Sequence, residues 1–327
     1  MSANSVAENL KRARRGVGQS GSGRAPKPPS GVATPRKRKL LNARTWTLLA
    51  FALPSLVLLL LINLYPVIYA FIQSLHNGTL LSSGPFVGFQ NYISIVQESS
   101  FWHAALFTVI FTVVGVFGSW LVGLAMALLL RTHIPANGLF KVLLLLPWIV
   151  PVVVSATSWN WLVATPQSPL PIIAQALGFG NVLFLANPLL AQITVCVFKV
   201  WISFPFMMMM MSSALASVDT NVYEAAKVDG ASNWQGFRLI TLPLIARTTF
   251  VSWILMTIFC VNDFPTIFLL TGGGPVNSTQ SLVVLAYLTV FQNFQTGPGV
   301  AIAFLMTFVL VVISVVLYRQ IRKVNIE

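Results

Sequence analysis

The chain has 327 residues, of which 56% are hydrophobic and only 8% are charged, and its formal net charge is +13. This composition excludes a soluble globular domain, because long apolar runs without charges need lipid around them. The sequence also contains no Gly-Lys-Ser/Thr phosphate loop, no His-Glu-x-x-His motif and only seven acidic residues. We therefore expect a polytopic membrane protein that is not an enzyme and has no Walker-type ATPase site of its own.

The positive charge is concentrated at the N-terminus. Eleven of the twenty basic residues lie before residue 45, interleaved with Gly, Ser and Pro. Such a segment buries too little apolar surface to fold alone, so residues 1–44 are predicted to be a disordered cytoplasmic tail that touches anionic lipid. Nucleic acid is not expected as a partner, because the tail has no aromatic residue to stack on bases. Residues 45–327 are predicted to be the membrane domain.

Six apolar segments follow the tail, each long enough to cross about 30 Å of hydrocarbon as a helix. They are predicted at residues 46–73, 102–130, 142–163, 189–216, 246–270 and 299–319. Residues 280–296 are also apolar but short and bounded by Gly-rich turns. We expect a partly buried re-entrant or surface helix there, not a seventh span.

The remaining basic residues indicate the orientation of the chain. Eight of the other nine lie on the same side as the N-terminus, whereas residues 74–101, 164–188 and 271–298 contain no Lys or Arg. By the positive-inside rule, both termini are expected to be cytoplasmic. No metal site is expected, because the three histidines are scattered along the sequence and Cys196 and Cys260 resemble small apolar fillers within spans.

A polar segment at about residues 218–245 interrupts the apolar pattern between the fourth and fifth predicted spans. Three candidate N-caps begin it: Asp219, Thr220 and Asn221. Gly230 can take the left-handed conformation that ends a helix. Ser232 and Gln235 have the spacing of a capping box, which predicts a second helix that Pro243 is expected to close. The segment is therefore predicted to be helix, glycine turn, helix.

This polar segment carries a family resemblance. It resembles the EAA loop of the permease subunits of bacterial ABC importers, and an ordinary amphipathic connector is the alternative interpretation. The matching positions are Glu224, Ala225, Ala226, Asp229, Gly230, Ala231, Phe237, Leu242 and Pro243. Residues 86–92, 201–206 and 270–275 are similar to segments of the maltose and glycerol-phosphate permease group. The likeness runs from about residue 46 to 321.

The resemblance implies an all-α polytopic membrane protein of the bacterial cytoplasmic (inner) membrane, with six transmembrane helices and the type I ABC importer permease fold. It implies a sugar or related carbohydrate as substrate, and alternating access driven by ATP hydrolysis on a separate subunit. The implied partners are a second homologous permease, two copies of a cytoplasmic ABC ATPase and an external sugar-binding protein. ATP and Mg²⁺ would sit on the ATPase, and this chain would bind no cofactor. The implied ATPase-coupling residues are Glu224, Ala225, Ala226, Asp229, Gly230 and Ala231.

Charged residues within spans are candidates for the substrate pathway, because a bilayer penalises them unless they face a cavity or a partner. Lys199 lies within the fourth predicted span, and Asp263 lies beside Asn262 in the fifth. The two charges either pair as a structural contact or line a polar channel. Aromatic rings pack on the apolar faces of sugars, which adds Trp159, Trp161, Trp201 and Tyr287. Tryptophans near span ends are, however, more often interfacial anchors.

Two other function classes fit the composition less well. A secondary transporter needs no ATPase but uses ion-coupling acids near mid-membrane, where this chain offers only Asp263. A membrane enzyme or scaffold is disfavoured, because catalytic acids, bases and metal ligands are missing. The EAA-like loop favours the importer permease over both.

Overall fold

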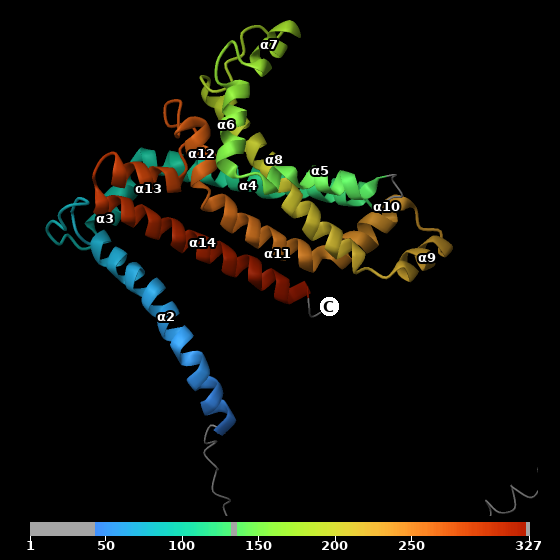
Figure 1. The fold of residues 1–327 in the computed structure, drawn as a ribbon, viewed down its shortest axis with the longest axis horizontal. Helices are drawn as coiled ribbons and strands as arrows, with labels where there is room; N and C mark the ends of the chain where they lie inside the picture. The colour runs from blue at the N-terminus through green and yellow to red at the C-terminus, as the bar shows by residue number, and fades with distance from the viewer. Residues whose placement is uncertain (1–42, 132–135, 325–327) are drawn as a thin grey trace, which may run out of the picture. The chain divides into compact units, whose positions relative to one another are not determined.

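The computed structural model describes residues 43–131 and 136–324, so residues 1–42 of the predicted tail lie outside it (Figure 1). The described residues are helical apart from turns, loops and two isolated β-bridges, which confirms the predicted all-α class. From Leu59 onward the described residues form one compact unit, and the first part of the N-terminal helix belongs to a separate one.

Within residues 43–131 and 136–324, five helices are long and apolar enough to span a membrane. They are α2 (Ala43–Ser74), α4 (Ser99–Leu129), α8 (Pro188–Ala216), the continuous run of α10 (Asn233–Gln235), η1 (Gly236–Thr241) and α11 (Leu242–Val261), and α14 (Thr296–Val324). A bent pair, α5 (Asn137–Ile149) and α6 (Val152–Val163), makes a sixth crossing if it is counted as one span.

The third predicted span, residues 142–163, is wrong as a single helix. Its two halves, α5 and α6, meet at an angle of 90°. Val150 has an extended conformation (φ −67°, ψ 132°) and Pro151 caps α6. A residue that precedes proline is disfavoured in the helical conformation, which accounts for the break at this point.

The fifth predicted span, residues 246–270, is wrong at both ends. Pro243 does not close a helix, because the chain passes through the π-helical segment η1 and continues into α11. A proline collides with the carbonyl four residues earlier, and the wider π turn relieves that collision. At the other end α11 stops at Val261, and Asp263 caps a new helix, α12 (Phe264–Thr271), by accepting a hydrogen bond from the Thr266 N–H.

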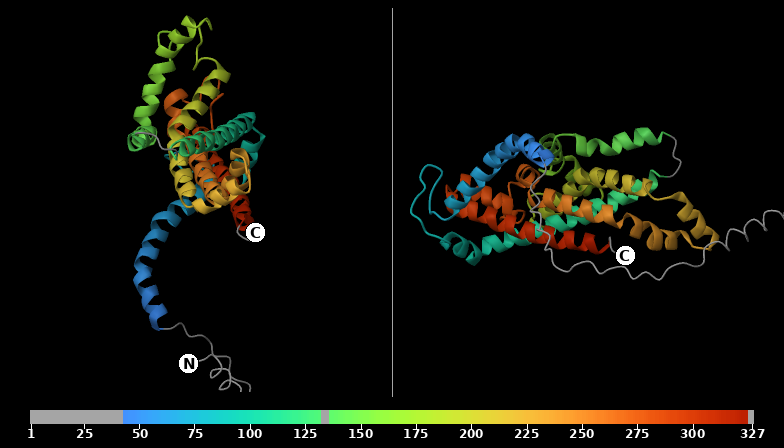
Figure 2. Two further views of the ribbon diagram at one scale, coloured as in Figure 1. Left: turned by 90° about the vertical axis from the view of Figure 1, so that its right-hand side faces the viewer. Right: turned by 90° about the horizontal axis from the view of Figure 1, so that it is seen from below.

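The core of the compact unit is the contact between α4 and α8, with α11 beside both (Figure 2). Gly115, Gly118 and Gly123 on α4 leave no room for a Cβ atom. A Cβ at Gly123 would lie 2.7 Å from both Met207 Cβ and the Met208 backbone nitrogen. Small residues let two membrane helices approach closely, so the glycines of α4 fix the position of α8, the most buried span.

Short helices complete the unit: α3 (Gln90–Gln97), α7 (Pro169–Ala176), α9 (Thr220–Val228) and α13 (Leu282–Phe291). The helix α13 has 10 residues, too few to cross a bilayer. It packs on α14 and α4, and its residues Leu282, Val284, Ala286 and Thr289 are buried. The prediction of a short, partly buried helix within residues 280–296 is therefore confirmed.

Candidate functional site

The polar segment forms the predicted helix, glycine turn, helix. Of the three candidate N-caps, Asp219 is the one that caps α9, by accepting a hydrogen bond of 2.9 Å from the Asn221 N–H. At the other end Gly230 has φ +81°. The Gly230 N–H donates to Lys227 O at 3.1 Å, and the next N–H donates to Ala226 O at 2.9 Å. This is a Schellman motif, which satisfies the last carbonyls of a helix.

The second half of the loop begins as the sequence predicts. Ser232 Oγ accepts from the Gln235 N–H at 3.3 Å, and the Gln235 side chain accepts from the Ser232 N–H at 2.8 Å. These two bonds form the predicted capping box. Both halves of the loop are thus fixed by local hydrogen bonds and not by burial, since neither α9 nor α10 has a buried residue.

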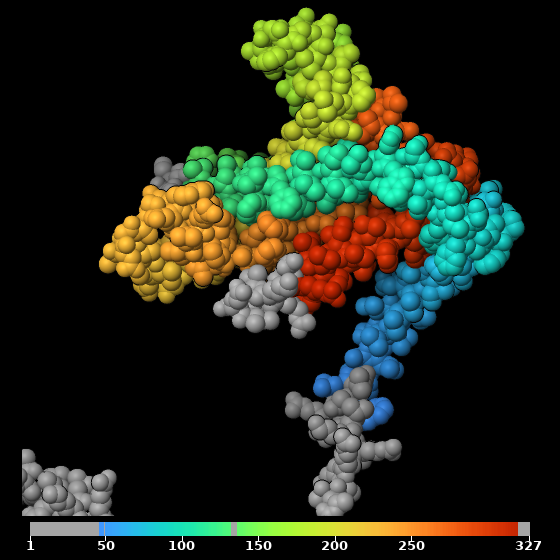
Figure 3. Space-filling view, turned by 180° about the vertical axis from the view of Figure 1, so that it is seen from behind, coloured from blue at the N-terminus to red at the C-terminus, as the bar shows by residue number. Residues whose placement is uncertain are grey.

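The six predicted coupling residues divide between two sides of the loop. Glu224, Ala225, Asp229 and Gly230 are exposed, whereas Ala226 and Ala231 are half-buried and line a hollow of ≈ 170 Å³ under α9. Val228, which the motif did not single out, is 87% exposed next to them. In Figure 3 the segment that carries these residues projects at one end of the compact unit. Its outer face presents two carboxylates around a small apolar surface.

A cleft of ≈ 300 Å³ with mixed polar and apolar lining, called the polar cleft below for its charged, amide and hydroxyl residues, lies where the two helix breaks meet α8. Its lining comes from the α5–α6 break, from α8 and from the α11–α12 break. The lining residues are Trp148, Val150, Val152, Lys199, Ile202, Ser203, Phe259, Asn262, Asp263, Pro265 and Thr266. Interrupted helices at membrane depth are tolerated where they line a cavity or are covered by protein. The charged and amide candidates from the sequence, Lys199, Asn262 and Asp263, therefore all line this cleft.

Lys199 and Asp263 form an ion pair at the wall of this cleft. Lys199 Nζ lies 2.7 Å from Asp263 Oδ2, and the two side chains are 7% and 8% exposed. Asp263 Oδ1 accepts from the Thr266 N–H at 3.0 Å, so both carboxylate oxygens have partners. The ammonium group also lies 5.8 Å from the centroid of the Phe111 ring. The structure shows the pairing considered from the sequence. The two charges also line the cleft, and their place in a substrate channel stays a prediction.

Two hydroxyl groups in the cleft were not anticipated from the sequence. Ser203 is fully buried and Thr266 is 1% exposed, yet neither hydroxyl has a hydrogen-bond partner among the described residues. Buried polar atoms normally have partners, so these two hydroxyls, which are buried behind the wall of the cleft, are left unsatisfied by the described residues. The sequence does hold a signal for Ser203, because it lies four residues after Lys199 and thus on the same face of α8.

The aromatic candidates lie elsewhere. Trp159 and Trp201 have ring centroids 5.5 Å apart and both contact Phe198. The ring of Tyr287 contacts the rings of Phe264 and Phe268 in α12 and of Phe291 in α13. Trp161 is 68% exposed. None of these four lines the polar cleft, where the aromatic residues are Trp148 and Phe259.

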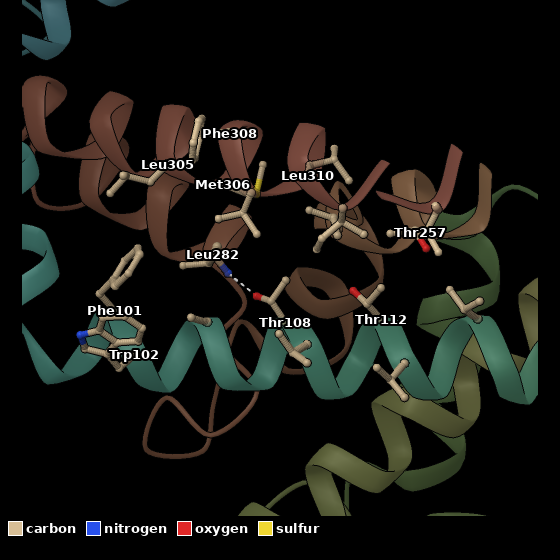
Figure 4. Close-up of a pocket in the computed structure, with 18 of the residues that line it drawn as sticks. Phe101, Trp102, Thr108, Thr112, Thr257, Leu282, Leu305, Met306, Phe308 and Leu310 are labelled. Carbon is tan, nitrogen blue, oxygen red and sulfur yellow. Dashed lines mark hydrogen bonds between the residues drawn. The ribbon is translucent and has the colours of Figure 1, made fainter. Parts of the chain in front are cut away.

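A larger cavity, of ≈ 540 Å³, lies between α4, α11 and α14 and is almost entirely apolar (Figure 4). Phe101 and Trp102 project into it from α4, and Leu305 and Phe308 from α14. Its Thr108 hydroxyl is already bonded to the Leu282 N–H at 2.9 Å. A cavity of this chemistry suits hydrocarbon and offers a sugar few partners, so the smaller polar cleft is the candidate substrate site.

Apolar spans, a projecting helix-turn-helix loop and a polar cleft at two helix breaks together define a multi-pass transport protein of the inner membrane. The chain belongs to the family described as the binding-protein-dependent transport system inner membrane component, whose model matches residues 119–325. It is thus a permease of the ABC importer type, as its loop suggests.

Similar proteins agree with this family. The chain is 34% identical to the trehalose/maltose transport system permease protein MalF of Thermococcus litoralis, over 83% of this chain and 92% of that protein. It is 31% identical to the trehalose transport system permease protein SugA of Mycobacterium tuberculosis, over 83% and 88%. Its fold is similar to that of a bacterial ABC transporter involved in the import of alginate, with a TM-score of 0.74 and 21% identity over 86% of this chain and 96% of that one.

Proposed function

We propose that this chain is the permease subunit of an ATP-driven importer for a sugar or related carbohydrate. The observation that carries the proposal is the outer face of α9, where the side chains of Glu224, Ala225 and Val228 are exposed to solvent. A helix that has no buried residue but is fixed by caps at both ends is suited to bind in a groove of another protein.

The partner on this face is a cytoplasmic ATPase, present in two copies, and Glu224 and Asp229 meet basic residues of its groove. This chain supplies no ATPase site and binds no cofactor, so ATP and Mg²⁺ belong to the ATPase. A second, homologous permease completes the pathway. Both termini lie in the cytoplasm, on the side of the loop. ATP binding moves the loop as a lever, and the spans then alternate between an outward-facing and an inward-facing arrangement.

The substrate class is supported by the polar cleft and by the relatives. The cleft has hydroxyl, amide and charged groups beside the Trp148 ring, a mixture that suits the hydroxyls and the apolar face of a sugar ring. Two relatives are named for trehalose transport, and a fold neighbour was solved with an alginate pentasaccharide-bound periplasmic protein. An external sugar-binding protein delivers the substrate in this proposal.

The experiment that tests the proposal begins with purification of the tagged chain in mild detergent and identification of co-purifying proteins by mass spectrometry. We expect an ATPase and a second permease. The complex is then reconstituted with the binding protein, and ATP hydrolysis and uptake of labelled trehalose and maltose are measured. Recovery of the chain alone, with sugar uptake that does not need ATP, would overturn the proposal in favour of a secondary transporter.

Two substitutions in the loop sharpen the test. Glu224→Lys reverses a charge on the outer face, and Gly230→Pro is incompatible with φ +81°. We expect both to abolish ATP-coupled uptake while the spans still fold. Glu98→Lys, an equal charge reversal at another exposed position, is the matched control and is expected to transport normally.

A further inference from the structure

Tyr223 precedes the first residue of the EAA-like motif and is half-buried on the inner side of α9. Its ring contacts the guanidinium group of Arg131, close to the end of α4. Arg131 follows the last residue of α4 by two positions, and its guanidinium carbon lies 4.7 Å from the centroid of the Tyr223 ring. This distance is within the range of a cation–π interaction. The ring thus connects α9 to α4.

The hydroxyl group of the same side chain connects α9 to α11. Tyr223 Oη lies 3.2 Å from Thr241 Oγ1, and Thr241 Oγ1 donates to Gly236 O at 3.2 Å. Because a threonine hydroxyl has a single hydrogen, Tyr223 must be the donor in the first bond. Thr241 is 4% exposed and is the last residue of η1, which continues directly into α11. The bond therefore ends on a buried part of a spanning helix.

Few other contacts hold α9 in place. The helix has no buried residue, and a hollow of ≈ 170 Å³ lies beneath it, lined by Leu128, Ala226 and Phe237 among others. A helix over a hollow can shift without moving its neighbours unless specific contacts tie it to them. Tyr223 makes two such contacts, one with Arg131 and one with Thr241.

We propose that Tyr223 is a positioning residue that transmits movement of α9 to two spanning helices, to α4 through Arg131 and to α11 through Thr241. The inference rests on the proposed function, because it describes how the same loop moves the spans. The helix α11 reaches the polar cleft through Phe259, and α4 packs against Lys199, which lines it. A Cβ at Gly115 of α4 would lie 3.1 Å from Lys199 Cγ. The helix α11 ends directly before Asn262 and Asp263. At the rise of an α-helix, the chain from Thr241 to Asn262 is about 30 Å long.

The test uses the full complex with its ATPase and second permease in proteoliposomes. Val152→Cys, at the wall of the polar cleft, is introduced after Cys196 and Cys260 have been replaced by serine. The rate at which a small methanethiosulfonate reagent labels the introduced thiol is measured with and without trapping by ATP, Mg²⁺ and vanadate. The ratio of the two rates reports whether the cleft responds to the ATPase.

Substitutions along the linkage are expected to lower this ratio while the ATPase still co-purifies and hydrolyses ATP. Tyr223→Ala removes both contacts and is expected to bring the ratio close to one. Arg131→Gln and Thr241→Val each remove one contact and are expected to lower it about two- to fivefold. Arg131→Lys and Thr241→Ser keep the cation or the hydroxyl and are expected to restore most of it. Arg247→Gln, at another exposed arginine, is the matched control.

The outcomes separate the two proposals. If the complex without linkage substitutions neither contains an ATPase nor responds to vanadate, the proposed function fails. If it responds, and Tyr223→Ala responds equally, the linkage inference is overturned and the function stands. Should Tyr223→Ala fail to assemble, Arg131→Gln and Thr241→Val decide the question, because an unchanged ratio in both is incompatible with the inference.

Discussion

Lys199 of α8 and Asp263 at the start of α12 are 64 positions apart in sequence, and their side chains meet at 2.7 Å inside the membrane domain. Asp263 also caps α12. The ion pair therefore joins α8, the most buried span, to the break between α11 and α12. The same pair lines the polar cleft, so one contact serves both the packing of the helices and the electrostatics of the candidate site.

Removing one partner of this pair is expected to destabilise the protein strongly. Lys199→Met leaves the Asp263 carboxylate buried without its cation, at an expected cost of about 3–5 kcal/mol. In the double variant Lys199→Met/Asp263→Asn no charge is left, and the amide oxygen still caps α12, so most of the stability should return. Thermal unfolding of the purified complex in detergent measures both. Equal losses in the single and double variants would contradict this account, and Lys141→Met, at an exposed lysine, is the control.

The glycines of α4 make a second prediction. Gly123→Ala places a Cβ 2.7 Å from Met208 N, a backbone atom, so α4 and α8 must move apart at an expected cost of about 1–3 kcal/mol. Gly138 of α5 has no atom within 4 Å of its hypothetical Cβ, and Gly138→Ala is expected to be neutral or slightly stabilising. The midpoints of thermal unfolding compare the two, and similar midpoints would show that α4 and α8 are not in close contact.

The glycine turn of the loop between α9 and α10 predicts a graded series of effects at one position. Gly230 has φ +81° with open space around it, so conformation and not crowding limits substitution. Gly230→Ala should cost about 1–2 kcal/mol locally, whereas Gly230→Asn should cost less, because asparagine tolerates this conformation. We expect coupled uptake to fall in the order Gly, Asn, Ala with no change in assembly. Gly236→Ala is the control, because Gly236 is helical with φ −58°.

The unpartnered hydroxyls predict a change in function without a loss of stability. Ser203→Ala and Thr266→Val remove groups that have no protein partner among the described residues, so unfolding should be unchanged or slightly improved. If the cleft opens during transport and these buried hydroxyls then bind the sugar, each substitution should raise the KM for uptake about five- to tenfold, the effect of one lost hydrogen bond. An unchanged KM would remove both residues from the pathway. Ser213→Ala, at an exposed position of α8, is the control.

Features set by local interactions were predictable. The turn at Gly230 and the capping box of Ser232 and Gln235 each depend on residues within a few positions of one another, and both are present. The start of α9 was predicted only as one of three N-caps, with capping-box spacing at Asn221 and Glu224, and the structure selects Asp219. The short helix at Leu282–Phe291 was likewise indicated by its length. The two helix breaks were not predicted, because the spans were assigned from hydropathy, which registers neither the backbone restriction before Pro151 nor the N-cap at Asp263.

The sequence by itself determined the class of the protein, the number of apolar segments and the position of the helix-turn-helix loop, because these follow from composition and from contacts along the chain. Only the tertiary structure decided that Lys199 pairs with Asp263, that Ser203 and Thr266 share their cleft, and that the tryptophan candidates lie outside it. Those relationships join α6, α8, α11 and α12, and they depend on how closely the helices pack, a property of side-chain volume in three dimensions that no local pattern encodes.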